Sequence, residues 1–139
     1  MARSVAVAKA LLDFYAARSV GEAREVADHI STGDDVLVIG TSGSDWIEGR
    51  TAWLAAIEIA SASGPSPPIT PGPELRGYEE GRIGWAVDRP SLNLHAGVSV
   101  PLRVSAIFRL EMASWRLVSF HASVGVPDEI LDELIRSAS

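Results

Sequence analysis

A proline-rich segment divides the chain into two parts with different hydrophobic periods. Five of the eight prolines lie within residues 61–73, so this segment cannot be a helix or a central strand. We expect an exposed connection there, with room for an edge strand. Apolar residues recur at three and four residue intervals before the segment and in β-like runs after it. The sequence therefore predicts an α+β fold, with helices first, a mostly antiparallel sheet next and a helix at the end.

Helices and one strand are predicted ahead of the prolines. The expected helices cover residues 5–18, 21–30 and 52–62. Thr51 is expected to cap the third helix. Residues 36–39, Val-Leu-Val-Ile, form the continuous apolar run of a strand that is covered on both faces. Residues 40–45 are interpreted as a simple turn, because they lack the motifs of a phosphate loop or a nucleophile elbow.

Strands are predicted after the prolines, followed by one more helix. The expected strands cover residues 74–80, 82–89, 98–110 and 115–124. Pro101 indicates a bulge or a sheet edge at the start of the third of them. The last helix is expected to begin at Pro127, since proline is favoured at the first position of a helix. The two carboxylates that follow it lie at the positive end of the helix dipole, where negative charge is favourable. Its apolar face consists of Ile130, Leu131, Leu134 and Ile135.

Composition excludes several classes of protein. A chain of 139 residues is expected to form a single domain, residues 1–139, with a core of its own. The absence of cysteine excludes a disulfide scaffold, a thiol nucleophile and a cysteine-built metal site. The excess of 18 acidic over 12 basic residues gives a net charge of -6, so nucleic acid is not expected as a partner.

Neither a membrane span nor a secretory leader is expected. Charged residues interrupt every apolar run before it reaches the length of a span. Residues 4–12 resemble the apolar part of a leader, but Lys9 lies in the middle and Asp13 closes it. We therefore expect a helix of a cytoplasmic protein that does not bind membranes.

Both faces of the last predicted strand are largely apolar. Strict alternation places Leu117, Ser119 and His121 on one face and Val118, Phe120 and Ala122 on the other. An antiparallel sheet with one face in water would alternate more cleanly. Since the helices can cover only one face, we expect a homodimer in which a second copy covers the open sheet face.

Three short motifs occur in an order typical of one fold family. Residues 46–50, Trp-Ile-Glu-Gly-Arg, lead into the third helix, and residues 84–86, Gly-Trp-Ala, lie on a strand. Residues 115–123 combine Trp-Arg-x-Val with His-x-Ser. Across residues 8–134 the chain thus resembles the SnoaL-like branch of the NTF2-like superfamily. The resemblance implies a curved sheet wrapped around a long helix as a cone, with an apolar pocket in its mouth, usually in a homodimer.

The resemblance does not fix an activity, because the superfamily includes ketosteroid isomerase, scytalone dehydratase and polyketide cyclases beside proteins that catalyse nothing. The catalytic positions of a ketosteroid isomerase fall near Phe14, near Ile39 or Gly40, and near Ala106. None of these side chains can donate or accept the required proton. A slip of one residue would supply Tyr15 but no acid. Isomerase chemistry of that type is not expected, and the Asp-Arg-Asp relay of epoxide hydrolases is not recognisable.

Polar candidates for a site lie on two predicted strands. His121 and Ser123 share one strand face, where His121 is a candidate acid, base or hydrogen-bond donor to a ligand. The alternative is a histidine that only packs. Asp88 is the best placed carboxylate for a base, and its alternative is a surface acid paired with Arg89 or with an arginine of a neighbouring strand.

Aromatic residues are the candidates for an apolar pocket. We expect Phe14, Trp46, Trp53 and Trp85 to line it, with His121 and Ser123 as polar contacts. The alternative is that they pack in the core or at the dimer face, which we favour for Trp115. No metal site is expected, since the three histidines show no ligand spacing, and no cofactor motif is present.

Three functions remain open. The first is binding of a small hydrophobic molecule in the pocket, without demonstrated catalysis. The second is an isomerase, cyclase or dehydratase that acts on a hydrophobic metabolite, with His121 or Asp88 as base. The third is a non-catalytic structural dimer module whose pocket is filled by its own side chains.

Overall fold

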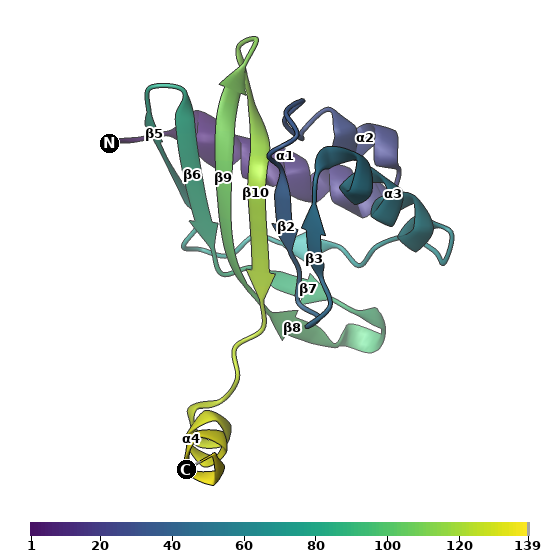
Figure 1. The fold of residues 1–139 in the computed structure, drawn as a ribbon, viewed down its shortest axis with the longest axis vertical. Helices are drawn as coiled ribbons and strands as arrows, with labels where there is room; N and C mark the ends of the chain where they lie inside the picture. The colour runs from purple at the N-terminus through teal and green to yellow at the C-terminus, as the bar shows by residue number, and fades with distance from the viewer. Residues whose placement is uncertain (139) are drawn as a thin grey trace.

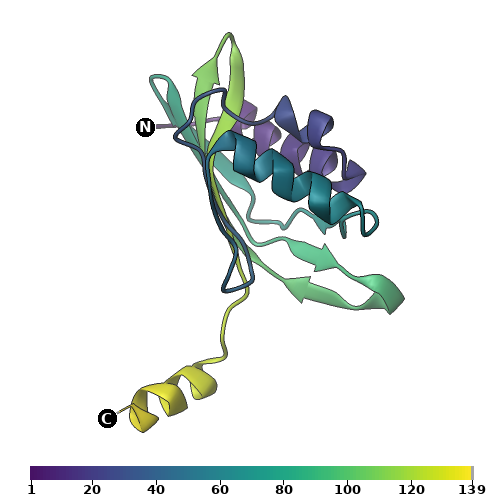
Figure 2. The same cartoon turned by 45° about the vertical axis from the view of Figure 1, so that its right-hand side comes forward.

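The architecture is a curved sheet whose one face is covered by three helices (Figure 1, Figure 2). A computed structural model describes residues 1–138. The three covering helices are α1 (Val5–Val20), α2 (Ala23–Ala27) and α3 (Arg50–Ser61). A fourth helix, α4 (Asp128–Ser137), lies apart from them, and His95–Gly97 form a 3-10 turn. The strands of the large sheet, in spatial order, are β1 (Ala2–Arg3), β5 (Arg76–Glu80), β6 (Ile83–Asp88), β9 (Arg103–Glu111), β10 (Ser114–Ser123), β2 (Leu37–Ile39) and β3 (Trp46–Glu48). A small sheet contains β4 (Ile69–Thr70), β7 (Ser91–Asn93) and β8 (Ser99–Pro101).

Pairing within the large sheet is antiparallel except where β2 joins β10 in parallel. The small sheet extends from one end of the large sheet on the helix side, and α4 lies beyond the end of β10, away from α1, α2 and α3 (Figure 2). This arrangement confirms the predicted α+β class and the cone, including its C-terminal helix. No helix in residues 1–138 is long and apolar enough to cross a membrane.

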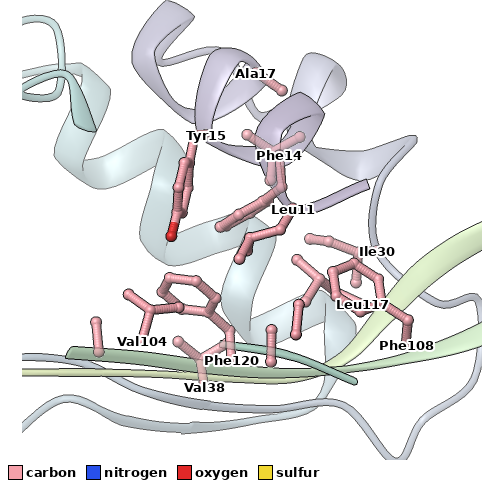
Figure 3. Packing of buried hydrophobic residues seen from close by; sticks show 14 of the residues in the cluster. Leu11, Phe14, Tyr15, Ala17, Ile30, Val38, Val104, Phe108, Leu117 and Phe120 are labelled. Carbon is pink, nitrogen blue, oxygen red and sulfur yellow. The ribbon is translucent and has the colours of Figure 1, made fainter. Parts of the chain in front are cut away.

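Helix α1 is the longest helix, and local signals fix both of its ends. The Ser4 hydroxyl accepts a hydrogen bond from the Val7 N–H at 3.1 Å, and Gly21 ends the helix in the left-handed conformation at φ +80°. Between these residues Val7, Leu11 and Phe14 turn toward the sheet and are almost completely buried. In Figure 3, Leu11, Phe14 and Tyr15 point from α1 toward Val104, Leu117 and Phe120 on the strands. The helix is thus where the period predicts it, but its core face is rotated from the expected stripe of Val5, Ala8, Leu11, Leu12 and Tyr15, since Val5 is 87% exposed.

Several predicted boundaries are corrected by the structure. The helix expected at residues 21–30 is only the short α2, and Ile30 instead forms a bridge with Leu117. The strand expected at residues 98–110 is divided into β8 and β9 at Leu102, beside Pro101. Helix α3 starts at Arg50, after Gly49 at φ +96°, and Thr51 does not cap it. The edge strand for which the prolines leave room is β4.

A β-bulge corrects the predicted faces of the last strand. Leu117 pairs with Phe108, but the next pair is Ser119 with Ile107, so β10 has one extra residue at Val118. The extra residue puts Leu117 on the helix side, together with Phe120 and Ala122, where all three are buried. His121 remains on the opposite, outer face, where it is exposed.

Close contact between α1 and β5 depends on Gly77. A Cβ atom at this position would lie 2.6 Å from the Ala8 nitrogen and 2.8 Å from the Ser4 carbonyl oxygen, both backbone atoms. We expect Gly77→Ala to lower the free energy of unfolding by roughly 1–3 kcal/mol, because the helix must move off the strand. Urea unfolding measures the loss. The control is Gly43→Ala, where nothing lies within 4 Å of the new Cβ, and equal losses in the two variants would contradict the prediction.

Candidate functional site

A cavity of about 270 Å³ lies between α1, α3, the inner face of the large sheet and the small sheet. Most of its wall is apolar, and the side chains that define it come from five elements and a connection: Phe14, Val38, Ile47, Trp53, Leu102 and Phe120. The inward-facing positions of β2, β3 and β10 supply the floor, because alternate residues of a strand point to the same face. The pocket thus lies between the inner face of the sheet and the helices that cover it.

Aromatic rings build one corner of this cavity. The ring of Phe14 lies 4.9 Å from the ring of Phe120 and 5.7 Å from that of Trp53, measured between centroids, with tilted planes. Such tilted pairs are favourable beyond the area they bury. All three residues are buried, yet the cavity between them and the small sheet stays open. The wall is a preformed apolar surface.

Arg18 brings a cation to this wall. It follows Phe14 by four residues on α1, so it continues the buried stripe of the helix. Its Nη1 donates to the Pro67 carbonyl oxygen at 2.8 Å, which ties the helix to the proline-rich connection. Burial lowers the pKa of the Arg18 guanidinium, since the charged form is poorly solvated there.

Asp45 is the acidic group of the wall. It ends the turn between β2 and β3, where its Oδ2 accepts the Ser42 N–H at 3.1 Å and its carbonyl accepts the Gly40 N–H at 2.8 Å. Gly40 and Thr41 of the same turn also line the cavity. The segment that the sequence marks only as a turn is therefore part of the cavity wall.

Asp88 is buried beside the core, not paired at the surface. Only 4% of it is exposed, its Oδ2 accepts the Tyr15 hydroxyl at 3.0 Å, and its Oδ1 accepts the Gly72 N–H at 3.1 Å. Burial raises the pKa of the Asp88 carboxyl, against the effect of these hydrogen bonds. Burial, and then the neighbouring Asp88, raise the pKa of Tyr15. The surface alternative is wrong, and Arg89 pairs with Glu74 instead, at 3.4 Å.

Asp88 and Tyr15 are not among the residues that line the cavity. Their hydrogen bond joins α1 to β6, and Asp88 also holds the backbone at Gly72. The geometry therefore gives the pair a structural role in positioning α1.

The structure brings Phe14 and Trp53 together in the cavity wall and places the other predicted site residues elsewhere. Trp85 lies on the outer sheet face, stacked on Tyr78 at 4.4 Å. His121 and Ser123 line a shallow hollow on that outer face. Trp46 is 61% exposed on the edge strand β3. Each of these residues has strand neighbours that point inward, so alternation turns its own side chain away from the cavity.

Metal ligands do not gather in the described part of the chain. Residues 1–138 contain no group of three or more His, Asp or Glu side chains that could hold a metal ion. Of the described residues that line the cavity, the ionisable ones are Arg18 and Asp45. The sequence predicts neither of these two as a site residue, nor the apolar wall residues Val38, Ile47, Leu102 and Phe120. A signal for Arg18 was present, because it falls on the apolar stripe of its helix.

Known structures with the same fold share little sequence with this chain. A proposed dehydratase of the NTF2-like family from Streptomyces avermitilis superposes with a TM-score of 0.71 at 19% identity, covering 88% of this chain and 95% of that one. An NTF2-like protein of unknown function from Pseudomonas putida KT2440 has a TM-score of 0.71 at 14% identity, with coverages of 88% and 86%. A proposed ketosteroid isomerase from Shewanella frigidimarina has a TM-score of 0.68 at 15% identity, with coverages of 86% and 96%.

These likenesses show the NTF2-like fold alone, because the identities are low. No curated protein sequence matches the chain. The match to a family model gives more direct evidence of the family. Residues 7–127 match the SnoaL-like domain, and all residues that line the cavity lie within this range. The chain belongs to the SnoaL-like domain family.

Proposed function

We propose that this protein binds a small hydrophobic molecule in the cavity between α1, α3 and the inner sheet face. The observation that carries the proposal is an open, mostly apolar space of about 270 Å³ next to the packed rings of Phe14, Trp53 and Phe120. Ligand pockets start at roughly this size, and apolar walls with a few polar groups are their usual composition. A ligand with one ring or a short chain fits such a volume.

Native mass spectrometry of protein purified from its own host tests this proposal. We expect an added mass that is lost on denaturation, as a molecule held without a covalent bond would show. An added mass on the wild type that persists in a variant with a filled cavity would contradict binding at this place.

Ala56→Phe is the variant that fills the cavity. Ala56 lines the cavity from α3, so a benzyl side chain there would occupy the space of the ligand. We expect the affinity for any apolar ligand to fall at least about tenfold, the loss of about 1.4 kcal/mol of binding free energy. Ala55→Phe is the matched control, because the neighbouring Ala55 is exposed and does not line the cavity. Isothermal titration calorimetry compares the two, and equal affinities would overturn the assignment.

An enzyme that uses His121 or Asp88 as base has no support in this geometry. His121 faces outward in the shallow hollow, and Asp88 is buried behind α1 with Tyr15. A general base must reach the proton that it removes from the bound substrate. The solved structures described as isomerase or dehydratase are too distant in sequence to lend their chemistry to this chain.

We also propose that two copies pair through the outer face of the large sheet. Ile83 and Ile107 are 47% and 41% exposed on this face, beside the stacked rings of Tyr78 and Trp85. The apolar residues of α4, which lies outside the helix layer, are also exposed, at 47% to 61%. A second copy seated on the sheet would cover such a surface, as closed two-fold pairs do.

Ile107→Glu is expected to convert the dimer to a monomer, because a two-fold interface would bury the new carboxylate twice. Sedimentation velocity at micromolar concentration distinguishes the 14.8 kDa chain from its dimer. Ile59→Glu is the control, since Ile59 is 75% exposed on α3, on the helix side of the sheet. A wild-type particle of 14.8 kDa would refute the dimer.

We propose a cytoplasmic location for this protein. The support is that the segment resembling a leader forms the first part of α1. Val7 and Leu11 of that segment are completely buried in the core. Removal of this segment as a leader would remove part of the core.

A further inference from the structure

The most unusual group on the cavity wall is Arg18, a cation in a mostly apolar surface. Its one described hydrogen bond is that from Nη1 to the Pro67 carbonyl oxygen. Among residues 1–138, no carboxylate lies within 4.0 Å of its nitrogens. A guanidinium has five N–H donors, so most of its donor capacity is unused by the protein.

The remaining donors are not sealed inside the protein. Within residues 1–138 no fully buried side-chain nitrogen or oxygen lacks a hydrogen-bond partner. The Nε and Nη2 atoms of Arg18 therefore keep access to solvent or to the cavity that the residue lines. Arg50, which is also partly buried, differs from Arg18 in the number of backbone acceptors it contacts. Arg50 gives its Nη1 to the carbonyl oxygens of Ala27, Ile30 and Ser31.

We infer that the ligand is a small monocarboxylic acid with an apolar body, whose carboxylate is bound by the free donors of Arg18. The inference rests on the proposed function and names its ligand class. Charge-assisted hydrogen bonds from a guanidinium to a carboxylate are among the strongest that proteins make, and a bidentate pair adds orientation. The apolar rings of Phe14 and Trp53 would then hold the body of the same ligand.

Because the chain is negatively charged overall, a preference for acids over neutral ligands would report on the groups at the binding site itself. At -6 the protein as a whole repels anions, and Asp45 adds a negative charge to the same cavity wall. A preference for acids over neutral analogues therefore cannot come from the general field of the protein. It would have to come from local donors on the cavity wall, among which Arg18 carries the positive charge.

Isothermal titration calorimetry with matched ligands tests the inference on the wild-type protein. The probes are 3-phenylpropionate, its primary amide and its primary alcohol, which share one apolar body. We expect the acid to bind at least about tenfold more tightly than the amide or the alcohol, as hydrogen bonds to charged groups allow. Equal affinities of the acid and the amide would overturn the role of Arg18 and leave the proposed function standing. Failure of all three to bind would overturn both.

Arg18→Gln assigns the preference to this residue. In this variant the affinity for the acid should fall to that for the amide, while the affinity for the alcohol changes less than about threefold. Arg24→Gln is the matched control, because it removes the same charge from an exposed side chain of α2 and should keep the acid preference. Persistence of the preference in Arg18→Gln would overturn the inference. Should that variant fail to fold, the acid-to-amide ratio of the wild type still decides the outcome.

Discussion

Replacement of Asp88 by Ala is expected to lower the free energy of unfolding by about 2–5 kcal/mol. The substitution removes the acceptor of the buried Tyr15 hydroxyl and of the partly buried Gly72 N–H. Each buried donor left without a partner costs roughly 1–3 kcal/mol. Tyr15 is 3% exposed, so water cannot replace the lost carboxylate without opening the packing of α1 on β6. Urea unfolding followed by circular dichroism measures the loss.

Asp88→Asn is the control for this prediction. The amide keeps the shape of the side chain, and its oxygen can still accept the Gly72 N–H while its NH2 group donates to the Tyr15 oxygen. We expect a loss well below that of the Ala variant. Equal losses would mean that the hydrogen bonds of Asp88 contribute little and that its volume alone matters.

The pH dependence of stability separates the charge of Asp88 from its hydrogen bonds. Burial raises the pKa of this carboxyl in the folded state above its unfolded value, so the folded protein binds the proton more tightly. As pH rises from the ordinary aspartate pKa through the raised folded pKa, this group should lower the stability, and the decrease ends above that window. Asp88→Asn lacks the titration. The wild type should therefore lose stability relative to Asp88→Asn across the window, and a constant difference would contradict the raised pKa.

Long, strongly periodic elements were the predictable part of this fold. The recurrence of apolar residues at three and four residue intervals predicts α1, although it does not select Val7 or Phe14 for the core face, and the order of motifs around residues 46–50 and 115–123 predicts the cone. Strands of three residues, such as β3 and β7, are too short to show a period. The bulge at Val118 could not be predicted from the sequence either, because the assignment of strand faces by strict alternation assumes that no extra residue is inserted.

The candidate site was predictable only in its aromatic part. Phe14 and Trp53 lie on predicted helices, and both line the cavity, although the predicted stripe of the first helix runs beside Phe14. Trp85 and His121 lie on strands with two apolar faces, so the sequence alone could not determine which face looks into the cone. Arg18 resembles an ordinary basic residue in the last turn of a helix, where a cation is favourable anyway. Only its place on the buried stripe distinguishes it.

Phe14→Ala is expected to cost about 3–5 kcal/mol of unfolding free energy, the usual range for a buried phenylalanine. The ring is 2% exposed and packs on both Phe120 and Trp53, so its removal leaves a void that rigid neighbours cannot close. Thermal and urea unfolding measure the loss. Phe108→Ala is the matched control, since Phe108 is 1% exposed in the same core but does not line the cavity.

The two variants should lose similar stability but differ in ligand preference. Removal of the Phe14 ring joins its volume to the cavity of about 270 Å³, so Phe14→Ala should bind larger apolar acids better than the wild type does. In Phe108→Ala the void lies outside the cavity wall, and the order of ligand sizes should not change. Calorimetry with acids of increasing ring size tests this difference. An unchanged size preference in Phe14→Ala would show that the ligand does not reach this ring, and would place the binding site away from the aromatic corner.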